Sequence, residues 1–188
     1  MITIYSSDSM GVRGNCLYPY RHEVTDAAGL RKAVRHDYVC AEYKNSYRSG
    51  GNFITSNCLG MDCDNDHTDH EHEWITPDDV RRNFPNVPLA IHFSRHHMKP
   101  KDQKSARPRF HCLFAIEPTT DVKAYADMKA RLNALFPYFD AQALDGARFF
   151  FGTDDPEVDF FLGTITLNEC LERYYPKEDS FANLPDGT

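Results

Sequence analysis

The sequence predicts a single domain of the α+β class. Its 188 residues are enough to bury a core, and its hydrophobic and charged contents of 41% and 26% are ordinary for a globular chain, which excludes disorder, collagen and coiled coil. Segments with the two-residue period of strands are interspersed with segments of helical period, without the regular strand–helix–strand rhythm of a parallel sheet. These two observations favour a mixed fold.

The expected helices follow capping residues. Residues 25–43 carry apolar side chains near helical spacing behind a Thr-Asp pair that can cap a helix. Residues 76–85 start with threonine, proline and two acids, which is a strong N-terminal pattern for a short helix. Residues 121–136 have an amphipathic stripe, and 166–175 predict a last short helix.

The expected strands lie between these helices. Strands are predicted at 57–64 and 87–94, and a polar stretch, 95–108, follows. A third strand, 109–116, places Phe110, Cys112, Phe114 and Ile116 on one face. Two short apolar runs bounded by turns predict strands at 147–152 and 157–162.

The composition indicates a cytoplasmic protein. No stretch approaches the roughly 20 apolar residues of a membrane span, and the first residues lack the regions of a signal peptide. Six cysteines form no CxxC pair, so we expect reduced thiols. We expect residues 1–170 to be the functional domain, and 171–188 an acidic tail that leads toward a helical domain of a longer protein.

Charge is segregated along the chain. The net charge is −7, which at first argues against a nucleic-acid partner. Residues 151–188 carry nine acids and two bases, and so account for all of it. Residues 51–75 carry six acids and no Lys or Arg, whereas 95–109 carry six bases and one acid. The basic segment is therefore expected to be available to phosphates.

The acidic pair Asp62 and Asp64 is the most informative feature. Residues two apart on a strand share a face, so both carboxylates point one way while Met61 and Cys63 point into the core. Adjacent carboxylates repel unless a cation lies between them, and Mg²⁺ or Mn²⁺ prefers such oxygens. Gly60 is expected to leave space for a close ligand. The alternative is a strand that ends in a solvated acidic turn.

The run that follows the acidic pair suggests zinc as a second possibility. His67, His70 and His72, with Cys58 and Cys63, supply suitable ligand atoms. Their spacing matches no known closed zinc site, and a mobile polar loop is the favoured interpretation.

Two further segments carry candidate phosphate and metal ligands. Arg107, Arg109 and His111 enter a strand from the basic loop, which suits a triphosphate, although an ordinary sheet histidine is the alternative. Asp140 precedes another strand and can supply a third carboxylate, with Arg148 eight residues on. Ordinary turn aspartates are the alternative there.

In this order, the motifs resemble the archaeo-eukaryotic primase (AEP) superfamily, in particular the primase-polymerase (PrimPol) domains of phages and mobile elements. The first family motif matches Asp62 and Asp64, the second matches His111, and the third matches Asp140. Arg109 stands where the family usually has serine. The resemblance spans roughly residues 45–165. It implies an RNA-recognition-type antiparallel sheet beside a second α/β module, with the active site in the cleft between them.

The resemblance also implies an activity. It implies template-directed nucleotidyl transfer, as DNA primase or DNA polymerase, by a two-metal-ion mechanism with Mg²⁺ or Mn²⁺. The implied metal ligands are Asp62, Asp64 and Asp140. His111 would contact the phosphates of a dNTP or NTP, and other residues would help to bind nucleotide or template: Arg107, Arg109, Arg148, Lys44, Arg48 and Asn52.

The implied partners are a single-stranded DNA template with its primer, a helical priming domain and a helicase. We expect this fragment to be a monomer that extends primers better than it starts them.

Three rival functions remain at this point. A rolling-circle replication nuclease would use a tyrosine such as Tyr174, in the pattern Tyr-x-x-Lys, but it also needs two histidines around one apolar residue on a strand. His92-Phe93-Ser94 and Arg109-Phe110-His111 both lack that pair. A non-catalytic nucleotide- or DNA-binding module and a metal-dependent phosphohydrolase are the other two.

Overall fold

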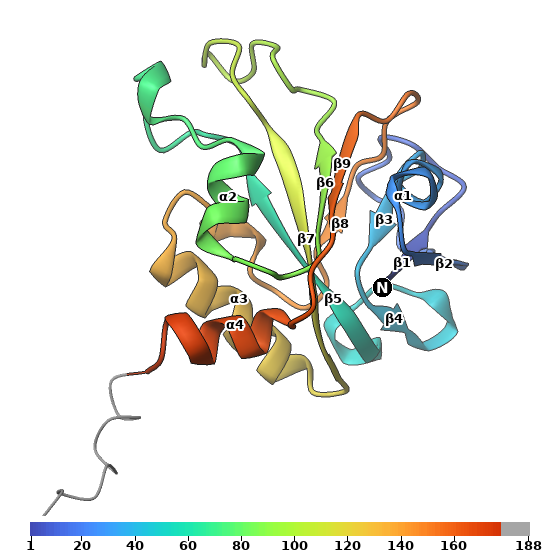
Figure 1. Ribbon diagram of the computed structural model, residues 1–188. Helices are drawn as coiled ribbons and strands as arrows, with labels where there is room; N and C mark the ends of the chain where they lie inside the picture. The colour runs from blue at the N-terminus through green and yellow to red at the C-terminus, as the bar shows by residue number, and fades with distance from the viewer. Residues whose placement is uncertain (178–188) are drawn as a thin grey trace, which may run out of the picture.

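Two antiparallel sheets and four α-helices make up residues 1–177, the part of the chain that the computed structural model describes (Figure 1). The α+β prediction is confirmed. None of the helices in this part of the chain is long and apolar enough to cross a membrane.

The larger sheet has five strands and carries most of the core. Its order is β4 (Glu42–Tyr43), β5 (Phe53–Cys63), β7 (Phe110–Thr119), β6 (Leu89–Phe93) and β9 (Val158–Phe161). The strands expected at 57–64, 87–94, 109–116 and 157–162 are confirmed. Strands β5 and β7 are the longest pair, and both of their faces are buried, one in each of two apolar clusters.

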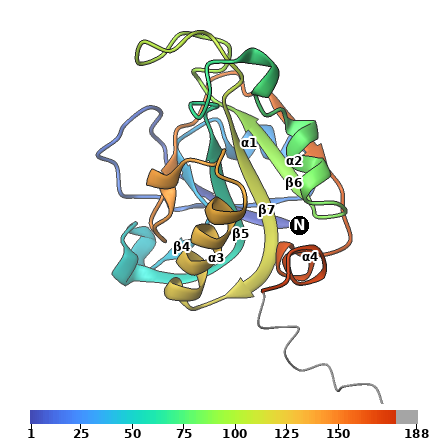
Figure 2. The same ribbon diagram turned by 90° about the vertical axis from the view of Figure 1, so that its left-hand side faces the viewer.

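Three helices cover one face of this sheet (Figures 1 and 2). They are α2 (Pro77–Asn83), α3 (Val122–Leu135) and α4 (Leu167–Tyr174), and the helices expected at these three places are confirmed. Threonine or aspartate caps each helix, and α2 has a capping box with Pro77 at its start. The expected apolar face of β7 packs under these helices, with Met61 and Cys63 of β5 beside it.

The smaller sheet packs on the opposite face of β5, β6 and β7. Its order is β2 (Tyr20–Val24), β1 (Ile2–Ser6), β3 (Tyr38–Val39) and β8 (Phe149–Phe150), with α1 (Ala27–Ala33) beside it. Strand β8 confirms the strand expected at 147–152, whereas β1 and β2 were not predicted. A second apolar cluster joins this unit to the larger sheet through residues such as Cys58, Ala90 and Leu113. The expected pair of modules is therefore present.

The helix predicted over 25–43 is wrong beyond Ala33. The buried Asp37 carboxylate accepts hydrogen bonds from the backbone N–H groups of Gly11, Val12 and Gly152, which fixes the chain in a turn. The next residues join the two sheets as β3 and β4. Tyr38 and Ala41 are buried as the helical pattern required, but by sheet packing.

Short 3₁₀ helices complete the described part, at Lys44–Ser46, Gly50–Asn52, Glu71–Glu73 and Ala141–Ala143. The first residues of the expected tail, 171–188, belong to α4 or follow it closely, and residues 178–188 lie outside the described part. The expected domain boundary stays a prediction.

Candidate functional site

A polar row crosses the larger sheet on the face that meets the smaller one. Asp62 of β5 pairs in register with His111 of β7, which pairs with His92 of β6. Two residues back on β5, the same face is apolar and belongs to the contact between the sheets. The polar row therefore begins where that contact ends, and side chains there border a cavity.

This cavity has a volume of about 570 Å³ and lies between the two sheets. Its wall contains five of the residues predicted from the sequence: Asp62, Asp64, His111, Asp140 and Arg148. The basic loop after β6 and the segment around β8 supply most of the rest of the wall. Four carboxylates and four Lys or Arg side chains line it in all, so its formal charge is balanced.

Asp62 sits deepest and is held by two partners. Its Oδ2 accepts a 2.6 Å hydrogen bond from Arg148 Nη2, and its Oδ1 lies 3.2 Å from His111 Nε2. Its side chain is 8% exposed, whereas that of Arg148 is 33% exposed. Arg148 Nε is buried without a hydrogen-bond partner among the described residues, so this guanidinium has donor capacity to spare.

Asp64 lies at the mouth of the cavity. Its Oδ2 is 2.9 Å from Lys101 Nζ, and the carboxylate is 24% exposed. The chain turns directly after it, because Asn65 adopts a left-handed conformation with φ of 54°. The Asn65 side chain anchors that turn through the carbonyls of Ile75 and Pro108. Lys101 was not predicted as a site residue, and its signal in the sequence is only the basic composition of its loop.

Asp140 is joined to the same strand end. Its backbone N–H donates to the Asp62 carbonyl over 2.9 Å, which joins the backbone before the short 3₁₀ helix to the end of β5. Its own Oδ1 accepts from Gln142 N, as the cap of the short 3₁₀ helix.

Five predicted nucleotide or template ligands do not line this cavity, among them Asn52, whose side chain donates to the Tyr47 carbonyl. Arg107 and Arg109 are fully buried. Arg107 donates to Asn65 O, Thr68 O and Asp69, and Arg109 donates to Asp64 O and Asp66. Both therefore tie the acidic loop to β7. Arg48 donates to the carbonyls of Ala147 and Asn15, and Lys44 is exposed near β4.

His111 has a partner on each ring nitrogen. Its Nδ1 is 3.1 Å from the hydroxyl of Tyr38, and that hydroxyl is also 3.1 Å from His92 Nδ1. Burial lowers the pKa of His111, although the Asp62 carboxylate opposes this effect, and burial lowers the pKa of His92 well below its usual value. Burial therefore favours the neutral form of both rings. Tyr38 and His92 were missed from the sequence because only the tertiary fold brings them to His111.

The space expected beside Gly60 is filled. A Cβ at this position would lie 2.6 Å from ring atoms of Phe150 and 3.0 Å from Cys40 Sγ. The glycine thus admits a side chain of the smaller sheet, and not a ligand.

The described residues contain no group of three or more His, Cys, Asp or Glu side chains placed to hold a metal, so they support neither the zinc alternative nor a preformed site of three carboxylates. Cys58 and Cys63 are buried in different apolar clusters, on opposite faces of the sheet. His67, His70 and His72 lie in the loop beyond β5.

The donor chemistry at Asp62 and Asp64 does fit a hard divalent cation. Mg²⁺ is commonly held by one or two carboxylates plus substrate phosphates, without a complete cage of protein ligands. In this structure, Arg148 contacts Oδ2 of Asp62, and Lys101 contacts Oδ2 of Asp64. A cation would compete with these two side chains for the same oxygens.

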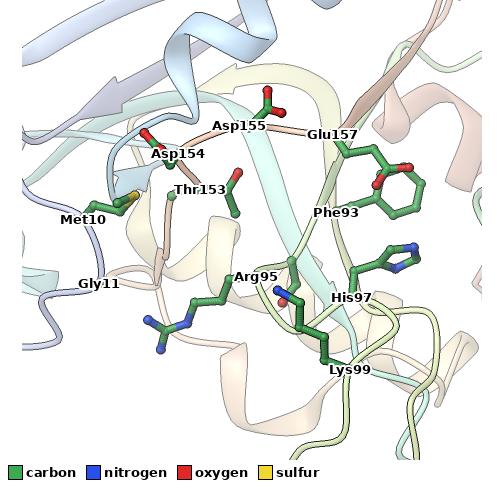
Figure 3. A pocket seen from close by; sticks show the side chains of 12 residues that line it. Met10, Gly11, Phe93, Arg95, His97, Lys99, Thr153, Asp154, Asp155 and Glu157 are labelled. Carbon is green, nitrogen blue, oxygen red and sulfur yellow. The ribbon is translucent and has the colours of Figure 1, made fainter.

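A second cavity, of about 510 Å³, adjoins the first and shares Ser94 and Arg95 with it. Figure 3 shows Arg95 and Lys99 on one side of this cavity, and Asp154 and Asp155 on the other. The two cavities follow the line along which the sheets meet the basic loop.

Comparisons with known proteins give one match. No family model matches the sequence, and no curated protein matches it. Among solved structures, the AEP domain of the primase-polymerase of cyanophage S-2L matches with a TM-score of 0.48 and 17% identity, over 91% of this chain and 88% of that domain. The function is accordingly argued from the site itself.

Proposed function

We propose that this domain catalyses metal-dependent nucleotidyl transfer, adding nucleotides to a primer on a DNA template. The observation that carries the proposal is the convergence of three carboxylates, Asp62, Asp64 and Asp140, with His111 and Arg148 on one cavity between the sheets. Paired carboxylates, a histidine donor and a guanidinium with spare donors suit a nucleoside triphosphate with its metal ions.

The metal ligands in this proposal are Asp62 and Asp64, with Asp140 as the third carboxylate. Bound Mg²⁺ or Mn²⁺ ions would activate the 3′-hydroxyl of the primer and stabilise the pyrophosphate leaving group. The cavity is electrically balanced without a metal, so each divalent cation makes it net positive. A triphosphate and its metal are therefore expected to bind together.

The basic side chains of the cavity change partners in this proposal. Arg148 and Lys101 pair with Asp62 and Asp64 in the free protein. When a cation takes those oxygens, the two side chains are released to phosphate oxygens, and His111 Nε2–H donates to a third. Arg148 Nε has no hydrogen-bond partner among the described residues. The guanidinium can therefore donate to a phosphate oxygen before its hydrogen bond to Asp62 is broken.

Template and primer are expected along the second cavity. Arg95, which lines both cavities, and Lys99 are exposed there, and Asp154, Asp155 and Glu157 line the same cavity. Few basic contacts predict modest affinity with a shallow salt dependence. A helical priming domain and a helicase as neighbours belong to the same proposal.

The rolling-circle nuclease is disfavoured by the position of its nucleophile. Tyr174 ends α4, which packs on the face of the larger sheet opposite to the cavity. The structure does place two histidines, His92 and His111, side by side, but on adjacent strands and both bonded to Tyr38.

The test is primer extension on a single-stranded template with Mg²⁺ or Mn²⁺. Asp64→Asn keeps the size of the side chain and removes the charge that binds the metal, and we expect a loss of about 100-fold or more. Asp159→Asn is the matched control, because it changes an exposed aspartate of β9 in the same sheet, and should extend as the wild type does. Equal extension by wild type and Asp64→Asn would contradict the proposed metal site. Template-independent release of phosphate would favour the phosphohydrolase.

A further inference from the structure

A chain of polar contacts runs from the cavity into the contact between the two sheets. His111 Nε2 lies 3.2 Å from Asp62 Oδ1, and His111 Nδ1 lies 3.1 Å from the Tyr38 hydroxyl. The same hydroxyl lies 3.1 Å from His92 Nδ1, and His92 Nε2 lies 2.9 Å from Thr153 Oγ1. Tyr38 and His92 are completely buried, and nothing in the proposed function uses them or Thr153.

The Tyr38 hydroxyl forces the two histidines into different protonation patterns. A phenol has one proton, so it donates to one imidazole and must accept from the other. Both contacts of Tyr38 are made to Nδ1 atoms. One ring therefore carries its proton on Nδ1 and the other on Nε2. Both hydrogen bonds exist at once only when one ring has an unprotonated Nδ1 and the other an Nδ1–H, and in two neutral rings these are opposite tautomers.

Asp62 decides which ring is which. A carboxylate only accepts hydrogen bonds, so the nitrogen that faces it at 3.2 Å is favoured in its N–H form. His111 then carries its proton on Nε2 and accepts from Tyr38 at Nδ1. His92 donates from Nδ1 to the Tyr38 oxygen, and its Nε2 accepts from the hydroxyl of Thr153. Each of the three hydrogen bonds in the chain then has one donor and one acceptor.

We propose that Tyr38, His92 and Thr153 are positioning residues that hold His111 in the Nε2–H tautomer, so that it presents a hydrogen-bond donor to the cavity. In the free protein this N–H faces the Asp62 carboxylate, whose Oδ1 lies 3.2 Å from Nε2. With substrate bound, the acceptor is a phosphate oxygen, a role of His111 that rests on the proposed function. In this tautomer Nε2 has no free lone pair, so His111 orients an anion and does not act as a general base there.

The far end of the chain reaches the second cavity. Thr153 lines that cavity, where Figure 3 shows it beside Asp154. The four hydrogen-bonding side chains therefore connect the walls of both cavities through the buried contact between the sheets. Phe150 stacks on Tyr38, with ring centroids 5.4 Å apart, and keeps the phenol in place.

The tautomers are tested directly by long-range ¹H–¹⁵N NMR of the imidazole rings in the full chain, without metal or nucleotide. Spectra of His92→Gln and His111→Gln assign the two rings. We expect Nε2–H for His111 and Nδ1–H for His92. The same tautomer in both rings, or a doubly protonated ring at pH 7.5, overturns the assignment. This measurement on wild type does not depend on activity or on whether any Tyr38 variant folds.

The positioning role is tested with Tyr38→Phe, which removes the hydroxyl and keeps the ring. Tyr125→Phe is the matched control, because it also removes one buried hydroxyl hydrogen bond, to Cys58 O, away from the histidines. We expect Tyr38→Phe to abolish the fixed tautomers and to lower primer extension by about 10- to 100-fold, as loss of an orienting partner does elsewhere. Tyr125→Phe should change neither readout.

The outcomes separate the two proposals. Tautomers as assigned in a wild type that does not extend primers would support the hydrogen-bond chain and overturn the proposed function. A folded Tyr38→Phe with altered tautomers and full activity would overturn the positioning role. At the other end of the chain, Thr153→Ser should preserve the His92 signature, and Thr153→Val should let that ring exchange between tautomers; identical spectra for the two variants would count against the role of Thr153.

Discussion

Lys129 of α3 should destabilise the native protein at neutral pH, and replacing it with methionine should stabilise the fold. Its side chain is 1% exposed, and its ammonium donates to the Asp145 carbonyl over 3.3 Å, a long hydrogen bond. Burial lowers the pKa of Lys129 to about 8, although Cys40 and Asp145 oppose this effect. The native state therefore holds a proton on this amine less tightly than the unfolded chain does.

The size of the effect follows from the two pKa values. The difference between about 8 in the native state and the ordinary value of 10.5 corresponds to about 3 kcal/mol. At pH 7 the amine is charged in both states, so the native state bears this whole cost. Methionine keeps an unbranched chain and loses one weak hydrogen bond, of about 1 kcal/mol. We expect Lys129→Met to raise the free energy of unfolding by about 2 kcal/mol at pH 7.

The sign can be checked against pH. Between pH 8 and 10.5 the unfolded chain binds a proton that the native state has lost, so the Lys129 contribution makes wild type more stable as pH rises. The advantage of Lys129→Met should be constant below pH 8 and shrink toward pH 10.5. Urea unfolding of both proteins at matched pH measures this difference, and the titrations of Tyr and Cys cancel in it.

Lys123→Met changes an exposed position of the same helix, where Asp127 raises the pKa of the lysine, so any pH-dependent difference there should have the opposite sign. A Lys129→Met protein that is no more stable than wild type at pH 7, or an advantage that persists undiminished at pH 10.5, would refute the reasoning.

Three further predictions concern the site. Gly60→Ala should cost about 1–3 kcal/mol in urea unfolding, since the new Cβ overlaps the Phe150 ring; an unchanged midpoint would show that the ring yields freely. Arg109→Met should lower the free energy of unfolding by at least about 2 kcal/mol, because its partners include Asp66 and a backbone carbonyl; a purely phosphate-binding arginine would leave stability intact. Chelation with EDTA should abolish primer extension, and Mg²⁺ or Mn²⁺ should restore it; activity that survives chelation would contradict metal dependence.

The sequence predicted the larger sheet and its covering helices well, for a local reason. Strands β5 and β7 hold short apolar runs, 58–61 and 112–116, that are bounded by polar residues, and threonine or aspartate caps precede α2, α3 and α4. Such signals lie within one element. In the smaller sheet only β8 was predicted, within the strand expected at 147–152. Strand β3 was missed because it has two residues and depends on pairing with β1 and β8, which no local pattern encodes.

The candidate site also has a part that local sequence patterns predict and a part that only the tertiary fold brings together. Asp62, Asp64 and His111 follow from strand alternation, which fixes the face on which each side chain lies. The partners that fix their chemistry come from elsewhere in the chain. Tyr38 is 54 residues from His92 and 73 residues from His111, and the helical spacing predicted around it concealed its place in a sheet.

The segregated charges of the sequence are the clearest case of an interpretation that the fold reverses. The acidic run after β5 and the basic loop before β7 bind each other: Lys101 pairs with Asp64, Lys104 and Arg107 with Asp69, and Arg109 with Asp66. Most of the bases that looked available to phosphate thus hold the acidic loop in place. Arg95 and Lys99 remain exposed at the second cavity. A template strand must therefore rely on few basic contacts, whereas the triphosphate gains its positive surroundings from the metal and from the arginine and lysine that the metal displaces.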